Sequence, residues 1–562
     1  MFSSQTTILP VICSLVYLHR SLTLFRHETH IPQISHYRFK NAEPSVSRVI
    51  LGAVFVGFFT AVPYYFSSGD SADLYNAIIK LVASILAYCL SLSLSIIAYR
   101  HSYIHPLATF PGPKAAVTTK WWMVHRILMK GGRHTKIQEL HAEYGPWVRV
   151  GPNELSINIP AAVRPIYSQL GRAPFYQGVP APADSLINVI NRKVHARRRQ
   201  AWNKAVTSDA MRSYIPILET RTSQLLSIFQ HISNQKEIIN LDHWINLFFI
   251  DVMGDMGFSG GFETMAAGKD GDEWIKTLNI GVIFASSMGQ VPWLRNLFKY
   301  LPRNGPIESF QKFTRAKVDE IKNSKVQRQN ILGIIMNESS VSLTADEAAA
   351  DASLLVVAAT DTGVQVVTTL FRYLSVDPGR TCRLQREISS VFVGDDGAYD
   401  YQALFALPYL DACIQESLRI IPPGPFGPAR TTGPEGAYIL GKRIAPNTTV
   451  HVPVFTMHRD PAHFGPLANY FIPERWIESE NQKNPLLSPC NHDAFMPFSS
   501  GYGSCVGKHL ALQNIKILVS SIIHKFDIEL KSGFDPIQFD KSYKEYGLWT
   551  HDALELMFKV RK

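Results

Sequence analysis

The sequence is poor in cysteine, and the six cysteines among its 562 residues include no Cys-x-x-Cys pair. This spacing excludes a disulfide framework and a zinc ribbon. Any cysteine that takes part in chemistry therefore acts alone or with other residue types. Glycine (35) and proline (34) occur at average frequency, which excludes collagen-like and low-complexity chains. With 46% apolar residues, a chain of this length can bury a large core without covalent cross-links.

The sequence also lacks internal repeats and any run of five or more basic residues. Lysine and arginine (56) nevertheless exceed aspartate and glutamate (46), which gives a formal net charge of +10. A basic excess fits nucleic acid, anionic lipid or an acidic protein as a partner. Because the sequence contains no nucleic-acid-binding motif, we predict no nucleic-acid partner. A membrane surface and a mildly basic surface without a specific partner remain as interpretations.

Two long uncharged stretches lie near the N-terminus, at residues 49–66 and 81–99. Each is close to the ~20 residues that a helix needs to cross a bilayer. We therefore predict that residues 1–105 form a membrane anchor with two transmembrane helices. The alternative is that both stretches are core helices. A third apolar stretch, residues 7–18, is shorter, and we expect it to be interfacial or partly inserted.

The charges around the two long stretches predict an orientation in the membrane. Asp70 and Asp73 lie between them, whereas the outer flanks carry the basic residues Arg38, Lys40, Arg48, Arg100, Lys114 and Lys120. Because basic flanks stay on the cytoplasmic side, the turn between the helices is predicted to be lumenal. The remaining body, residues 106–562, then faces the cytosol. Two prolines within residues 110–114 stop the helix between anchor and body.

The strongest helix signal in the body starts at Thr344. Thr344 and Glu347 have the spacing of a capping box, and helix-forming residues continue to about Leu374. The centre of this helix, residues 354–359, is apolar all round, which predicts burial on every side. Strand signals are weaker, and the clearest is a pair of short strands around a turn within residues 147–157.

Polar residues interrupt the middle of the predicted helix, at Thr360, Asp361, Thr362 and Gly363. Such residues weaken a buried helix or compete with its hydrogen bonds. A buried carboxylate beside a hydroxyl, where a glycine lets the helix loosen, is what a proton-delivery site needs. A solvated stripe and a hydrogen-bonded polar notch are the structural alternatives.

A second motif places Glu416 and Arg419 one helical turn apart among apolar neighbours. Such pairs are common on helix surfaces, but an ion pair in an apolar setting predicts burial and a need for a further partner. Arg475, in the proline-containing segment 471–476, is a candidate for that partner. The alternative is that this segment is an ordinary surface loop.

The most specific motif surrounds Cys505. Three glycines precede or follow it within residues 501–507, and a helix is predicted to start at Lys508. Glycines let the backbone approach a bulky ligand and direct amides at the sulfur, while the start of a helix favours a thiolate. A thiolate without cysteine or histidine companions is a poor zinc site but suits an axial haem ligand. A small buried cysteine in a turn is the alternative.

In their order and spacing, these motifs resemble the cytochrome P450 family, and fungal microsomal members in particular. The family's cysteine loop, Phe-x-x-Gly-x-x-x-Cys-x-Gly, matches Phe498, Gly501, Cys505 and Gly507. Its structural triad matches Glu416, Arg419 and Arg475, and its oxygen-activation helix matches the segment with Asp361 and Thr362. The similarity extends from about Pro111 to the C-terminus.

The resemblance implies a mainly α fold with a small β region, forming one haem domain behind the N-terminal transmembrane helices. It implies haem b with Cys505 as the axial thiolate, and Asp361 and Thr362 as the proton relay. It also implies that His195, Arg199 and Arg430 hold the haem propionates. One departure from the family pattern is Gly503, which stands where the family usually has a propionate-binding Arg or His, so weaker haem retention is expected.

The activity implied by the resemblance is a monooxygenase that inserts one atom of O2 into a C–H or C=C bond. NADPH would supply electrons through a cytochrome P450 reductase, and the enzyme would lie in the endoplasmic reticulum membrane with its catalytic domain in the cytosol. The reductase is expected on a basic face formed by Arg197, Arg198, Lys204, Lys508 and Lys516. We expect a lipophilic substrate from fungal secondary metabolism, with a terpenoid preferred.

Two other enzyme classes fit parts of the sequence. Residues 503–507 also match a Gly-x-nucleophile-x-Gly elbow, but too few residues follow Cys505 to complete a hydrolase sheet. A haem-thiolate isomerase or dehydratase would need neither O2 nor a reductase. Because it would also not need Asp361 and Thr362, their presence favours the monooxygenase.

Overall fold

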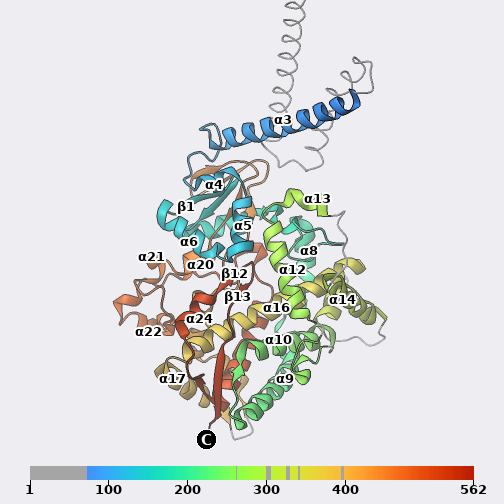
Figure 1. The fold of residues 1–562 in the computed structure, drawn as a ribbon. Helices are drawn as coiled ribbons and strands as arrows, with labels where there is room; N and C mark the ends of the chain where they lie inside the picture. Colours follow the sequence, from blue (N-terminus) through green and yellow to red (C-terminus); the bar gives the residue numbers. More distant parts are fainter. Residues whose placement is uncertain are drawn as a thin grey trace, which may run out of the picture.

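The computed structural model describes residues 73–260, 262–271, 273–298, 306–323, 330–338, 342–393 and 398–561. Helices dominate this part of the chain (Figure 1). The helices of seven or more residues are α3 (Asp73–His101), α5 (Trp121–Lys130), α6 (Arg133–Tyr144), α7 (Val163–Gln169), α8 (Arg192–Lys204), α9 (Ser208–Asn234), α10 (Leu241–Phe258), α12 (Trp274–Met288), α14 (Pro306–Asn323), α15 (Ile331–Asn337), α16 (Ala345–Leu374), α17 (Pro378–Ser389), α19 (Pro408–Ile420), α23 (Lys508–Lys525) and α24 (Pro536–Ser542).

Shorter helices connect these elements. They are α4 (Lys114–Thr118), α11 (Thr264–Ala267), α13 (Arg295–Phe298), α18 (Tyr401–Phe405), α20 (Val454–His458), α21 (Pro461–Phe464) and α22 (Glu478–Asn481), together with 3-10 turns that include η2 (Pro174–Gln177), η4 (Pro473–Trp476) and η7 (Gly501–Gly503).

The strands are short and form small sheets. The largest sheet has the order β1-β2-β10-β7-β3, and its strands are β1 (Trp147–Gly151), β2 (Glu154–Ile157), β3 (Gly171–Arg172), β7 (Arg430–Thr431) and β10 (Thr449–His451). A second sheet joins β4 (Ile239–Asn240), β11 (Phe526–Leu530) and β14 (Glu555–Val560). The remaining strands form three hairpins, β5 (Phe392–Val393) with β6 (Ala398–Tyr399), β8 (Ala437–Ile439) with β9 (Lys442–Ile444), and β12 (Lys544–Glu545) with β13 (Trp549–Thr550). A mainly α fold with a small β region is confirmed, as is the predicted hairpin, since β1 and β2 pair antiparallel.

The N-terminal helix α3 contains the whole of the predicted span 81–99 and starts earlier, so Asp73 is helical rather than part of a turn. Residues 75–101 are long and apolar enough to cross a membrane. Leu86 and Leu90 on this helix are each 63% exposed. The predicted span 49–66 and the apolar stretch 7–18 lie outside the described residues.

The long central helix α16 has the predicted ends and the predicted capping box. The amide of Thr344 donates to Glu347 Oε2 at 2.9 Å, and the amide of Glu347 donates to Thr344 Oγ1 at 3.2 Å. Figure 1 shows α16 running through the middle of the body, and it packs against α10 and α14. The expectation that residues 354–359 are buried on every side is wrong, because Ala358 is exposed. Ala358 and Thr362 share one helix face at i, i+4 spacing, and that face stays accessible.

The hydrophobic core lies between the helices that carry the site residues. Leu218 of α9, Phe248 of α10, Val367 of α16, Leu410 of α19 and Leu518 of α23 belong to one cluster and are all fully buried. The apolar stripes of these helices therefore hold α16 and α23 in fixed positions. Asp361 lies on α16, and α23 starts three residues after Cys505. This core therefore fixes the positions of both candidate site residues relative to each other.

Candidate active site

The cysteine loop is shaped by two backbone features. Gly501 has φ +68°, and a Cβ at this position would lie 2.2 Å from the carbonyl oxygen of Tyr167. Only glycine fits that approach. The amide of Cys505 donates to the carbonyl of Phe498 at 2.9 Å, which closes the loop. Gly507 then caps α23, so the sulfur stands at the start of this helix, as predicted.

The thiol of Cys505 is accessible and desolvated at the same time. Its side chain is exposed, yet burial raises its pKa above the usual value, an effect larger than the lowering by the Gly507 amide, Arg199 and Lys508. The Gly507 amide acts in the direction expected of a helix start, burial opposes it, and a bound metal would favour the thiolate. Within the described residues no cluster of three His, Cys, Asp or Glu could hold a metal.

A group of basic side chains lies beside the loop at Gly503. A Cβ on Gly503 would lie 2.6 Å from Arg430 Nη2 and 3.7 Å from Arg172 Nη2. His195 Nε2 lies 3.1 Å from Arg172 Nη2, and His195, Arg172 and Arg430 are all at least 95% buried. A larger residue at position 503 would therefore direct its side chain toward the guanidinium groups of Arg430 and Arg172.

Among the described residues, no ion pair joins this basic group to a carboxylate. Desolvation lowers the pKa of His195 to about 4, and the neighbouring charges that act on it, Arg172 first and then Arg199 and Arg430, lower it further. Arg430 Nε and Tyr502 Oη are buried without a hydrogen-bond partner among the described residues. Buried cations need an anion, so these residues fit the carboxylates of a bound haem.

Arg199, the other predicted propionate ligand, points at the cysteine loop itself. Its Nη1 donates to the carbonyl of Ser504 at 2.6 Å, and its Nε donates to Asn203 Oδ1 at 3.0 Å. Arg199 thus contacts Ser504, the residue before Cys505. Arg430 instead lies beside Gly503, and His195 contacts Arg172, which also lies near Gly503. Arg199 also raises the positive charge near the sulfur.

Arg172 is a site residue that the sequence did not reveal. It lies in the two-residue strand β3, where it pairs with Arg430 of β7. Arg172 stands more than 250 positions from Arg430, and no local pattern marks it. The pairing of two short strands alone places the two guanidinium groups together.

Asp361, in the polar segment of α16, has an unusually high pKa. Burial raises the pKa of Asp361 to about 7. Thr362 Oγ1 donates to the carbonyl of Ala358 at 2.7 Å. Gly363 does not loosen the helix, because α16 continues to Leu374. Instead, a Cβ on Gly363 would lie 2.6 Å from the Phe249 ring, so this glycine makes room for a neighbouring helix.

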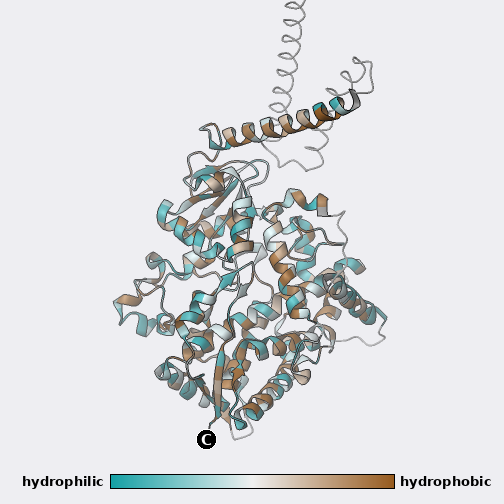
Figure 2. Cartoon of the chain, in the orientation of Figure 1, coloured by the Kyte–Doolittle hydropathy of each residue, from teal (hydrophilic) through white to brown (hydrophobic). Residues whose placement is uncertain are grey.

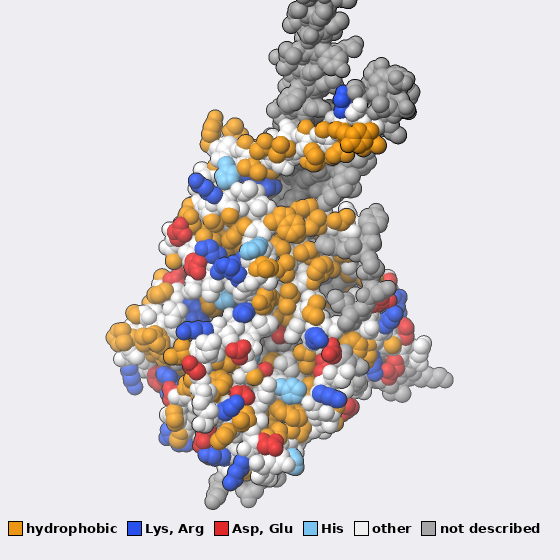
Figure 3. Space-filling view, in the orientation of Figure 1, with side chains coloured by type: hydrophobic (Ala, Val, Ile, Leu, Met, Phe, Trp, Pro, Cys, Tyr) orange, Lys and Arg blue, Asp and Glu red, His pale blue; other side chains and the backbone are white. Residues whose placement is uncertain are grey.

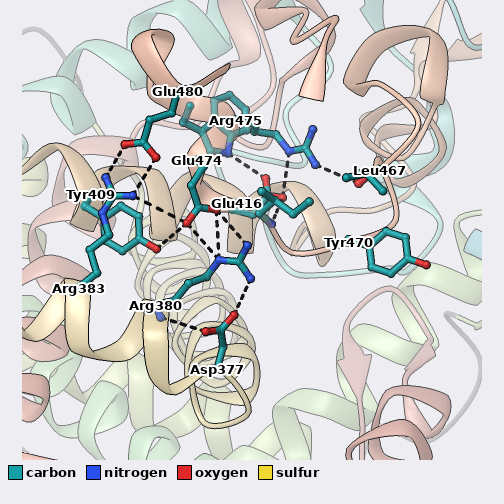
Figure 4. A network of polar contacts seen from close by, with 12 residues as sticks. Asp377, Arg380, Arg383, Tyr409, Glu416, Leu467, Tyr470, Glu474, Arg475 and Glu480 are labelled. Carbon is teal, nitrogen blue, oxygen red and sulfur yellow. Dashed lines mark hydrogen bonds and ion pairs between the residues drawn. The ribbon is translucent and has the colours of Figure 1, made fainter. Parts of the chain in front are cut away.

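Glu416, Arg419 and Arg475 form a buried ionic cluster, of which Figure 4 labels Glu416 and Arg475. Glu416 accepts from Arg419 at 2.7 and 2.8 Å and from Arg475 Nε at 3.1 Å. All three side chains are essentially inaccessible, so the exposed-pair and surface-loop alternatives are wrong. Burial would raise the pKa of Glu416, but Arg419 and Arg475 together hold it below the usual value. Arg419 also donates to the carbonyls of His458, Ala468 and Tyr470, so the cluster fixes the irregular segment that precedes η4.

The predicted basic face is only partly present. Arg197, Lys204 and Lys508 are exposed, whereas Arg198 and Lys516 are buried. Arg198 forms an ion pair with Asp351 at 2.7 Å, and Lys516 pairs with Asp411. Because the side chains of Arg198 and Lys516 are themselves buried, they do not contribute to a docking surface.

Comparison with known proteins yields one family. The sequence model of the family Cytochrome P450 matches residues 111–552. The chain is 33% identical to "Cytochrome P450 monooxygenase FCK2" of Fusarium pseudograminearum over 79% of this chain and 80% of the relative. It is 31% identical to "Cytochrome P450 67" of Uromyces fabae over 85% and 90%, respectively. It is 30% identical to "Tryprostatin B 6-hydroxylase" of Aspergillus fumigatus over 86% and 85%.

Proposed function

The chain belongs to the cytochrome P450 family and is a monooxygenase, and we propose that Cys505 is the axial thiolate of its haem b. The accessible, desolvated thiol at the start of α23 supports this role. A bound haem of this kind activates O2, and its thiolate ligand favours cleavage of the O–O bond. Phe498, Gly501 and Gly507 serve to shape the loop that holds the sulfur.

The propionates of the haem are proposed to lie among His195, Arg172 and Arg430. The observation that carries the proposal is that only arginines act on the buried His195 among the described residues, combined with the buried Arg430 Nε that has no hydrogen-bond partner there. Arg199 is proposed to act from the cysteine loop, where it adds positive charge near the sulfur. Arg172 supplies the positive charge that an arginine or histidine at position 503 would provide. It therefore compensates for the weaker haem retention expected from Gly503.

The first test is the carbon-monoxide difference spectrum of the reduced full-length protein in membranes. We expect a strongly red-shifted Soret band that Cys505→Ser abolishes. Cys382→Ser is the matched control, because Cys382 is exposed on α17 and should leave the band unchanged. Folded protein without the band, or a band that survives in Cys505→Ser, would refute the assignment.

Asp361 and Thr362 are proposed to deliver protons to the reacting oxygen. A carboxyl group with a pKa of about 7 can exchange protons with solvent at physiological pH. Thr362→Ala should keep haem but divert electrons to peroxide, and the ratio of product to NADPH consumed should fall by about tenfold. Thr362→Ser retains the hydroxyl and should restore the ratio. Wild-type coupling in Thr362→Ala would refute the role of Thr362.

We propose that NADPH-cytochrome P450 reductase supplies the electrons and that the enzyme lies in the endoplasmic reticulum membrane with its catalytic domain, residues 106–562, in the cytosol. Helix α3 consists mainly of hydrophobic residues (Figure 2), and several of its large apolar side chains are exposed, which supports the anchor. Apolar side chains also gather on the end of the body next to α3 (Figure 3). The exposed large apolar residues of α5, α12 and α13 are Trp121, Leu128, Met129, Ile280, Phe284 and Leu297. A second apolar surface next to a spanning helix favours contact with the bilayer.

The substrate is proposed to be a lipophilic small molecule of fungal secondary metabolism. The segments around Phe426 and Ala358 are apolar, as in pockets that bind such compounds, and a terpenoid remains the preferred class. One fungal relative is named as the 6-hydroxylase of tryprostatin B, so tryprostatin B is a second compound to test. Substrate-induced shifts of the Soret band would rank the two.

A further inference from the structure

The loop that precedes α8 has no helix or strand of its own between Gly178 and Asn191. Backbone groups in such a loop need partners from elsewhere in the fold. Within residues 184–189, buried charged side chains supply several of these partners. Leu186 and Val189 of this loop are each 5% exposed, whereas Ile187 between them is 45% exposed, so the loop lies at the surface with these two side chains turned into the body.

Asp351 of α16 and Arg198 of α8 hold this loop together. The amide of Leu186 donates to Asp351 Oδ1 at 2.7 Å, and Arg198 Nη1 donates to the carbonyl of Asp184 at 2.6 Å. Asp351 and Arg198 also pair with each other at 2.7 Å, and each is 1% exposed. Trp202 Nε1 donates to the second oxygen of Asp351 at 3.2 Å.

Arg172 holds the same loop from the opposite side. Its Nη1 donates to the carbonyls of Leu186 at 2.7 Å and Val189 at 3.0 Å. Its Nη2 faces His195 and the position of Gly503. Because a guanidinium group is a rigid plane, the two carbonyls that fix Nη1 also set the direction of Nη2.

We propose that Asp351, together with Arg198, is a positioning residue for residues 184–189, and that Arg172 couples this loop to the carboxylates of the bound haem. The second half rests on the haem assignment above. The loop orients Arg172 toward the cofactor, and by reciprocity a cofactor held by Arg172 stabilises the loop. Asp351 thus influences cofactor retention although it touches neither haem nor substrate.

The test compares haem-loaded full-length proteins. Asp351→Leu/Arg198→Leu removes both charges at once, because a lone buried charge would destabilise the fold. The matched control is Asp346→Leu/Arg315→Leu, which removes the same two residue types from an ion pair of 2.8 Å between α16 and α14 in which both side chains are exposed. Hydrogen exchange of the Leu186 amide and the rate of haem transfer to excess apomyoglobin are measured.

In Asp351→Leu/Arg198→Leu, the hydrogen of the Leu186 amide should exchange on the order of tenfold faster, because the amide loses its charged acceptor. Haem transfer should become severalfold faster as well. The control pair should change neither. Unchanged exchange at Leu186 would overturn the positioning role. Faster exchange with unchanged haem transfer would overturn the coupling.

A second variant keeps the inference testable if the leucine pair fails to fold. Arg172→Lys keeps the charge but cannot hold the two carbonyls and face the haem with one rigid group. It should accelerate both Leu186 exchange and haem transfer, and a wild-type rate in either would contradict the link through Arg172. Absence of a thiolate-haem band in the wild type would refute the proposed function and the coupling, while the exchange data would still decide the positioning role.

Discussion

Desolvation by the surrounding protein raises the pKa of both acidic groups that the site depends on, Asp361 and Cys505. The consequences differ because the neighbours differ. Cys505 has a backbone amide and two basic residues nearby, whereas Asp361 has no charge that shifts its pKa back. Near neutral pH Asp361 is therefore divided between its protonated and ionised forms, which suits the proposed proton transfer, whereas a bound metal would favour the thiolate form of Cys505.

The raised pKa of Asp361 predicts a pH dependence of stability. In the unfolded chain this group titrates near pH 4, and in the folded protein near pH 7. Between these values the folded state binds the additional proton, so this contribution to stability is full below about pH 4 and falls as the pH rises toward 7. The measurement is the thermal unfolding midpoint of the wild type minus that of Asp361→Asn. This difference should decrease between pH 4 and 7 and then become constant. A difference that does not vary with pH would contradict the titration.

Helices and irregular segments are joined by carboxylates that accept from several elements at once. Glu416 of α19 accepts from the amide of Ile472, from Arg475 and from Trp476 of the η4 region. Glu474 of η4 accepts in turn from Arg380 of α17 (Figure 4). This second carboxylate, absent from the sequence prediction, extends the cluster to another helix.

Replacement of Glu416 is predicted to loosen this junction. Glu416→Gln leaves Arg419 and Arg475 buried without a counter-charge, which should lower the free energy of unfolding by about 3–5 kcal/mol. Urea titration of the full-length protein measures the loss. Glu474→Gln is the control, because Glu474 is 20% exposed and water can replace part of its interaction. Equal losses in the two variants would show that burial of the cluster is not the cause.

At the scale of the molecule, different faces carry different side chains. The apolar helix α3 joins the body near α4, where Arg100 Nη1 donates to the carbonyl of Thr118 at 2.6 Å. The exposed apolar residues of α5 and α12 belong to the same end of the body (Figure 3). The exposed basic residues near the cysteine loop include Arg197 on α8 and Lys508 on α23. The proposed membrane contact and the proposed reductase docking therefore involve different exposed residues.

Charge reversal on the basic face is predicted to weaken reductase docking. Arg197→Glu/Lys508→Glu should raise the apparent KM for the reductase by about three- to tenfold at low salt, and the difference should shrink at high salt. The measurement is NADPH oxidation against reductase concentration. Lys541→Glu, an exposed residue on α24, should have no effect. A wild-type KM in the double variant would argue against this face as the docking surface.

The sequence was sufficient to predict structural features that depend only on residues close together in the chain. The capping box at Thr344, the hairpin of β1 and β2, and the helix start after Gly507 follow from neighbouring residues. The same holds for the motif around Cys505, because glycine spacing and the start of a helix are local properties. These patterns pointed to the family that the comparisons confirmed. The membrane anchor, the propionate ligands and the proton relay remain predictions.

Only the tertiary structure decided which charges are buried and which side chains meet. Arg198 and Arg197 are adjacent in sequence, yet one lies against Asp351 and the other faces solvent. Arg172 reaches the site because β3 pairs with β7, and the open face at Ala358 exists because the neighbouring helices leave it uncovered. Local propensity acts over a few residues, whereas burial and ion pairing depend on contacts between segments far apart in the chain. A sequence pattern can therefore single out Cys505 as the proposed haem ligand, but not the buried charges that lie near it.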